Sequence, residues 1–88
     1  MTIGLIFDGP GVTQEQYDQV FNQVMSNREK PPGMLSHHGG PSDSGWCVVE
    51  TWESPEDIKR FFDEKLGQAL GAAGINGQPR TFEITNSV

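Results

Sequence analysis

The chain has 88 residues, a formal net charge of −6 and a single cysteine. This length suits one domain, residues 1–88, which would bury only about 60–65% of the surface that the unfolded chain exposes. Six scattered basic residues against twelve acidic ones make nucleic acid and anionic membranes poor partners. One cysteine cannot form an internal disulfide, and the N-terminal residues resemble neither a signal peptide nor a membrane span, which together predict a cytoplasmic protein.

The first third of the chain predicts a strand and then a helix. Residues 2–8 alternate with fairly apolar side chains on both faces, as in a strand that is covered on two sides. Thr13 and Gln16 form a capping-box pattern, so a helix should begin near Gln14. Before the prolines at 31–32 end it, this helix should bury one apolar stripe, made of Tyr17, Val20, Phe21 and Val24.

The middle of the chain predicts a β-hairpin. One strand should run from Met34 to about Gly40, and the chain then turns through residues 41–45. Residues 46–52 are rich in β-branched and aromatic side chains and should form the returning strand.

The last third predicts a second helix and a final strand. Ser54 is a strong N-cap and Pro55 suits the first helical position. Apolar residues then continue at helical spacing. The predicted helix is weakened at Gly67 and ends at a glycine cap near Gly74. Residues 80–86 then alternate as a fourth strand.

The predicted element order, β-α-β-β-α-β, is that of the ferredoxin-like α+β fold, an antiparallel sheet with two helices on one face. The other face of the sheet would also carry apolar side chains, among them Val49 and Cys47. We expect Cys47 to be a small buried hydrophobic residue. Two such sheets packed face to face would bury these side chains, which predicts a homodimer.

Residues 40–70 carry a family resemblance: a Gly-Pro turn, a strand led by Trp46 that ends in Trp-Glu-Ser, and a capped helix with a Phe-Phe pair. In this stretch the chain resembles the antibiotic biosynthesis monooxygenase-like branch of the dimeric α+β barrel superfamily. The resemblance implies a dimer whose two sheets form a barrel, with a ligand cleft between helices and sheet in each subunit. Activities known in this superfamily include cofactor-free oxygenation of polyketide quinone precursors, haem degradation and aldol-type cyclisation of polyketides.

Both histidines lie next to each other in the predicted hairpin. Because neighbouring strand residues point to opposite faces, His37 and His38 cannot both reach one ion, and Cys47 and Glu50 are separated in the same way. We therefore predict no metal site. Glu50 could instead assist one histidine in acid–base chemistry from the facing strand.

The hairpin register decides which histidine accompanies Glu50. A loop of four residues, 41–44, places His37 on the face of Glu50, whereas a loop of five, 41–45, places His38 there. In the resembling family a histidine often stands four residues before the turn proline, which favours His37.

Two classes of function follow. In the first, a small enzyme without a bound cofactor uses the histidine and Glu50 to remove an acidic C–H or O–H proton, and the carbanion meets O₂ in an oxygenase or an internal carbonyl in a cyclase. In the second, a noncatalytic dimeric binding or accessory protein uses the same residues as core and interface. The ligand would be an apolar or aromatic small molecule, held by Tyr17, Trp46, Trp52, Phe61 and Phe62.

Overall fold

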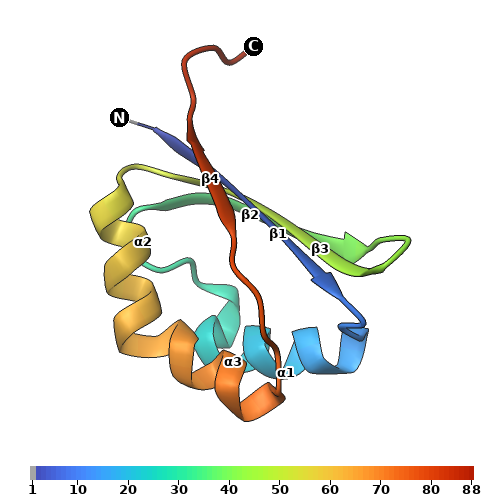
Figure 1. Ribbon diagram of the computed structural model, residues 1–88. Helices are drawn as coiled ribbons and strands as arrows, with labels where there is room; N and C mark the ends of the chain where they lie inside the picture. Colours follow the sequence, from blue (N-terminus) through green and yellow to red (C-terminus); the bar gives the residue numbers. More distant parts are fainter. Residues whose placement is uncertain (1) are drawn as a thin grey trace.

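A computed structural model describes residues 2–88 of the chain. Its four strands form one antiparallel sheet in the order β2-β3-β1-β4, and the helices lie together on one side of it (Figure 1). The predicted ferredoxin-like α+β fold is therefore confirmed. The strands are β1 (Ile3–Pro10), β2 (Met34–Pro41), β3 (Gly45–Trp52) and β4 (Arg80–Glu83), and the helical segments are α1 (Gln14–Val24), the 3₁₀ turn η1 (Ser26–Arg28), α2 (Pro55–Phe61), the π-helical turn η2 (Phe62–Leu66) and α3 (Gly67–Ala73).

β1 is one of the two inner strands of the sheet, next to β3. It pairs with β3 along its whole length and with β4 over residues 3–6. The predicted last strand, residues 80–86, is longer than the observed one. Glu83 already pairs with Ile3, the first residue of β1, so the residues after it have no further part of β1 to pair with. One more hydrogen bond, from the Ile84 amide to the Thr2 carbonyl (2.9 Å), continues the pairing beyond β4.

The helix ends follow the sequence signals. Thr13 caps α1 through a complete capping box, in which its Oγ1 accepts from the Gln16 amide and the Gln16 side chain accepts from the Thr13 amide. Ser54 caps α2, and Gly74 ends α3 in the left-handed conformation (φ 73°).

A wide helical turn, η2, joins α2 and α3 into one continuous helix. At the predicted weak point the Gly67 amide donates to the Phe62 carbonyl five residues earlier, which defines a π-helical turn. A Cβ atom at Gly67 would lie 3.1 Å from that carbonyl oxygen, so the missing side chain eases the turn.

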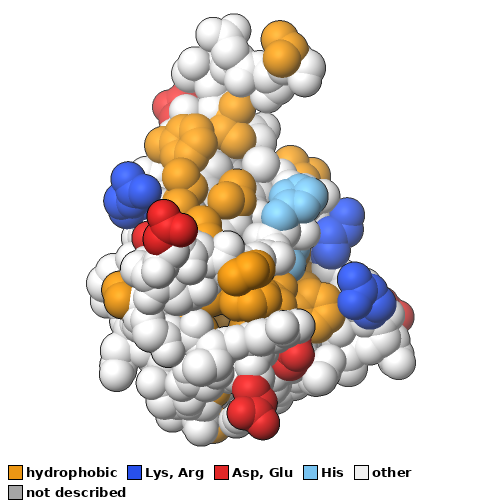
Figure 2. Space-filling view, turned by 90° about the vertical axis from the view of Figure 1, so that its right-hand side faces the viewer, with side chains coloured by type: hydrophobic (Ala, Val, Ile, Leu, Met, Phe, Trp, Pro, Cys, Tyr) orange, Lys and Arg blue, Asp and Glu red, His pale blue; other side chains and the backbone are white. Residues whose placement is uncertain are grey.

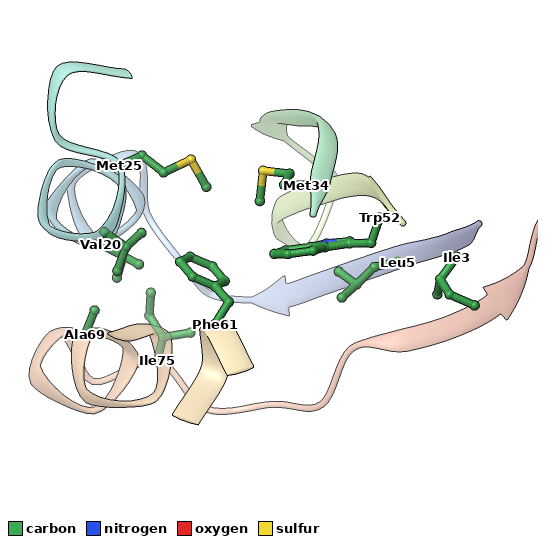
Figure 3. Close-up of a cluster of buried hydrophobic side chains, with 10 residues drawn as sticks. Ile3, Leu5, Val20, Met25, Met34, Trp52, Phe61, Ala69 and Ile75 are labelled. Carbon is green, nitrogen blue, oxygen red and sulfur yellow. The ribbon is translucent and has the colours of Figure 1, made fainter. Parts of the chain in front are cut away.

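The hydrophobic core fills the space between the helices and the inner face of the sheet. Figure 3 shows Phe61 reaching from its helix toward the side chains of α1 and the sheet, and its ring lies 5.6 Å from that of Trp52. Trp52 is the largest fully buried side chain among the described residues. The buried cluster consists of Ile3, Leu5, Val20, Val24, Met25, Met34, Trp52, Phe61, Ala69 and Ile75.

The outer face of the sheet carries exposed apolar side chains. Val49 is 44% exposed and Phe82 is 52% exposed, and the Phe82 ring covers Gly4 so closely that a Cβ atom there would overlap it. Cys47, expected to be buried, is a free thiol of intermediate exposure, because it alternates onto this outer face. Within residues 2–88, no helix is both long enough and apolar enough to cross a membrane.

Candidate functional site

The register of the β2–β3 hairpin places His37 directly opposite Glu50. The ladder ends at the pair Pro41–Trp46, one residue further along each strand than the loop 41–44 predicted, and Ser42 and Gly45 exchange two more backbone hydrogen bonds across the turn. A shift of one residue on each side of the turn preserves which side chains share a face. His38 pairs with Val49 on the outer face, so the alternative in which His38 accompanies Glu50 is wrong.

Four side chains form a continuous hydrogen-bonded chain. The carboxylate of Glu50 contacts His37 Nδ1 through Oε2 (2.6 Å) and accepts from the Trp52 indole through Oε1 (2.9 Å). On the other side of the imidazole ring, Nε2 lies 2.6 Å from the hydroxyl oxygen of Tyr17. Both ring nitrogens of His37 therefore have partners within the protein.

Glu50 is the one buried charged residue among residues 2–88. Its side chain is 9% exposed, and that of His37 is 12% exposed. A carboxylate is costly to remove from water unless hydrogen-bond donors replace the lost solvent. His37 and Trp52 supply such partners, one to each oxygen, and they also fix the direction of the carboxylate.

Helix α1 brings Tyr17 to the histidine. Tyr17 lies in the first turns of the helix, just after the Thr13 cap, and its ring stacks near that of His37 with 5.9 Å between centroids. Gly39, two residues after His37 on the same face of β2, makes this approach possible. A Cβ atom at Gly39 would lie 2.7 Å from the Tyr17 hydroxyl oxygen.

The environment keeps the Tyr17 hydroxyl protonated. Burial raises the pKa of Tyr17 above its ordinary value of 10.0, and the negative charges of Glu50 and Asp18 raise it further, while Arg28 acts in the opposite direction. A neutral phenol is therefore the form that His37 meets.

A cavity of about 140 Å³ lies between the helices and the inner face of the sheet. Figure 2 shows one face of the molecule, which is hollowed where hydrophobic side chains gather. Six of the residues predicted for the site line the cavity, namely Tyr17, His37, Trp46, Glu50, Phe61 and Phe62. Trp52 is absent from the lining, which corrects its expected role: it lies behind Glu50 and holds that carboxylate instead of contacting a ligand.

Comparison with known proteins identifies the architecture. No family model and no curated protein sequence matches the chain. Solved structures do: an antibiotic biosynthesis monooxygenase-like protein from Chloroflexus aurantiacus is 19% identical, with a TM-score of 0.69 over 100% of this chain and 97% of that one. The chain has the fold of the antibiotic biosynthesis monooxygenase-like proteins.

Two further structures share this monooxygenase-like fold. A similar protein from Deinococcus radiodurans is 12% identical, with a TM-score of 0.69 over 100% of this chain and 96% of that one. SnoaB from Streptomyces nogalater, a cofactor-independent oxygenase, is 13% identical, with a TM-score of 0.62 over 99% of this chain and 93% of that one.

Some residues of the cavity wall carry no signal in the sequence. The segment 75–79, between α3 and β4, lines the cavity with Ile75, Gly77, Gln78 and Pro79, although it forms no regular element. Spacing rules describe helices and strands, so they could not place this segment.

Trp46 has an unusual environment in the cavity wall. Its ring lies 4.9 Å from that of Tyr17, and its indole nitrogen is buried without a hydrogen-bond partner in residues 2–88. Buried donors are normally paired, so this nitrogen lowers the stability of the fold.

The chemistry available at the site is proton transfer. A neutral imidazole that donates through Nδ1 to a carboxylate can accept a proton at Nε2, and the carboxylate then stabilises the imidazolium. In the part of the chain that the structure describes, no three His, Cys, Asp or Glu side chains come together as metal ligands.

Proposed function

We propose that this protein is a small cofactor-independent monooxygenase-like enzyme that acts on an aromatic or polyketide-like small molecule. The observation that carries the proposal is the hydrogen-bonded pair of His37 and Glu50 in the wall of an apolar cavity. An imidazole oriented by a carboxylate beside a bound molecule is what general base catalysis requires. The fold shared with SnoaB, a cofactor-independent oxygenase, supports the same class of reaction.

The reaction begins with proton removal. The His37–Glu50 pair takes a proton from an acidic C–H or O–H group, and the electron pair left on a substrate carbon attacks O₂. The resulting peroxide is protonated and loses water to leave a carbonyl. A CH₂ group thereby gives four electrons to O₂, one oxygen atom enters the product and the other leaves as water, so the step needs no external reductant.

Oxygen uptake tests this proposal. We expect wild-type protein, in the presence of a chelator, to consume one O₂ per product formed from at least one member of a panel of quinols and anthrones. His37→Ala should lower kcat about 10²–10⁴-fold with little change in KM, because it removes the base and leaves the apolar walls.

His38→Ala is the matched control, since the neighbouring histidine lies on the outer face of the sheet. It should retain wild-type activity. Equal activity of His37→Ala and wild type, with both proteins folded, would show that the base has been assigned wrongly. Turnover without oxygen uptake would identify a cyclase, in which the same carbanion attacks an internal carbonyl.

One observation favours a second candidate, a noncatalytic binding protein. Both nitrogens of His37 are occupied by protein groups, as in a structural histidine. Ligand binding without turnover across the panel would support this candidate over the enzyme.

A further inference from the structure

The Tyr17 hydroxyl occupies Nε2 of His37 at the wall of the cavity. Tyr17 and His37 both line the cavity, yet Nε2, the nitrogen that would accept a proton, already lies 2.6 Å from the Tyr17 oxygen. A molecule in the cavity can reach Nε2 directly only if Tyr17 moves aside. The tyrosine oxygen is therefore the nearer end of the hydrogen-bonded chain for a ligand.

We propose that Tyr17 is the catalytic residue that receives the ligand's proton, and that the ligand is a one-ring phenol or a related ring with an ionisable O–H group. This inference rests on the proposed role of His37 and Glu50 as the base. It adds the group that touches the ligand and the chemical class of that ligand.

The direction of the hydrogen bonds supports this class. The indole of Trp52 can only donate, so Glu50 is an acceptor at Oε1, and its other oxygen takes the Nδ1 proton of His37. A neutral ring then accepts at Nε2 from the Tyr17 hydroxyl. Because the Tyr17 hydroxyl donates its proton to His37, its oxygen can only accept a hydrogen bond from a ligand. The ligand must therefore carry a hydrogen-bond donor.

Proton transfer along this chain conserves every atom. The ligand O–H bond breaks and its proton binds the Tyr17 oxygen, while the original Tyr17 proton moves to Nε2 of His37. The products are an imidazolium beside Glu50 and a ligand oxyanion that accepts a hydrogen bond from the renewed Tyr17 hydroxyl. No oxidant or reductant takes part in this step.

The charges around Tyr17 agree with a relay. Burial and the nearby Glu50 and Asp18 raise the pKa of the phenol, with only Arg28 opposing them, so Tyr17 does not persist as a tyrosinate. A group that stays neutral can pass a proton only by giving up its own at the same time, and His37 is placed to take it.

The size and lining of the cavity indicate how many rings a bound ligand can have. Its volume, about 140 Å³, is close to that of an apolar cavity known to hold one benzene molecule. Aliphatic and aromatic side chains supply most of the wall, among them Leu5, Val20, Phe61 and Leu70. One ring with its hydroxyl toward Tyr17 therefore fits better than a fused polycycle.

Binding of 4-nitrophenol tests the inference, because its anion absorbs visible light and its protonated form does not. At a pH where the free compound is mostly protonated, we expect the wild-type protein to bind it as the anion. Tyr17→Phe should bind 4-nitrotoluene, which has no O–H group, with affinity within about twofold of wild type, yet lower the anion signal of bound 4-nitrophenol about tenfold or more.

Gly39→Ala provides a second route that keeps the hydroxyl. Its new methyl group would lie 2.7 Å from the Tyr17 oxygen and push it away from His37, so the anion signal should fall here too. His38→Ala, on the outer face, should leave the signal unchanged. Thermal unfolding of each variant confirms that it is folded.

The outcomes separate this inference from the proposed function. Should His37→Ala lose the anion signal while Tyr17→Phe and Gly39→Ala keep it, His37 acts directly and the role given to Tyr17 is wrong. If none of these variants changes the signal, both the relay and the proposed base are wrong. Failure of wild-type protein to bind either probe would show that the proposed ligand class is wrong. The oxygen-uptake experiment tests the proposed function independently of this result.

Discussion

At the scale of single residues, the site depends on how Glu50 is held. Its two oxygens contact different partners, His37 on the cavity side and Trp52 on the core side. The two tryptophans of the chain therefore differ in whether the indole nitrogen has a hydrogen-bond partner. The Trp52 nitrogen binds a buried carboxylate, whereas the Trp46 nitrogen has no partner in residues 2–88.

A matched pair of substitutions measures this difference. Trp52→Phe removes a donor from a buried carboxylate and should lower the free energy of unfolding by about 1–3 kcal/mol more than Trp46→Phe does. Trp46→Phe removes a donor that is already unpaired, so its cost is mainly the lost ring volume. Urea unfolding of both variants gives the comparison, and equal losses would contradict the assigned hydrogen bond.

Alternation along β3 predicted that Glu50 shares a face with Trp46 and Trp52, and the hairpin parity that favours His37 proved correct. The bond between Tyr17 and His37 could not be predicted in the same way. It joins a helix to a strand, and its length depends on how closely α1 packs against the sheet, which spacing along one element does not encode.

At the scale of elements, one turn ties the beginning of β2 to the first turn of α2. Gly33 has a φ of 89°, and a Cβ atom there would overlap the side chain of Asp57. Asp57 cannot easily move away, because it binds both Ser54 and Arg60. The Gly33 carbonyl also accepts from the Glu53 amide (2.8 Å), which closes the junction.

Two glycines with positive φ allow this junction to be tested. A Cβ atom at Gly74 would contact nothing. Gly74→Ala should therefore lower the free energy of unfolding by about 1–2 kcal/mol, for the left-handed conformation alone. Gly33→Ala should cost about 1–3 kcal/mol more, since it adds an overlap with Asp57. Thermal or urea unfolding distinguishes the two, and similar losses would mean that the Asp57 side chain yields without penalty.

Element starts and caps were predictable because they depend on local hydrogen bonds, as at Thr13, Ser54 and Gly74. The length of β4 and the π-helical turn were not. The first depends on where the partner strand begins, and the second on a bond between Gly67 and Phe62 that ordinary helical periodicity does not contain.

At the scale of the whole molecule, the sheet has two unlike faces. Helices and core cover the inner face, while the outer face exposes Val49 and Phe82. Ile6 lies beside Val49, and Cys47 lies two residues before Val49 in β3, on the side away from Phe82. Exposed apolar side chains on a sheet commonly mark an interaction surface. We propose that a second copy of the chain covers this face, sheet against sheet.

Light scattering tests the assembly. We expect wild-type protein to have the mass of a dimer at micromolar concentration, because pairing would bury the outer face in both copies. Val49→Lys should give a folded monomer, since it adds a charge to that face and changes nothing in the core. Asn22→Lys, which places the same charge on the exposed side of α1, should remain dimeric. A monomeric wild type would contradict the proposal.

The inner position of β1 has a consequence for the order in which the chain is made. β1 is complete at residue 10, but its two neighbours are residues 45–52 and 80–83, so β1 is made before either of the strands that pair with it. Until they are made, its edges are open to other extended chains. Such distant pairings also slow folding, because a long loop must close before they form. The second edge of β1 therefore stays open until β4, which is far away in the sequence, has been made.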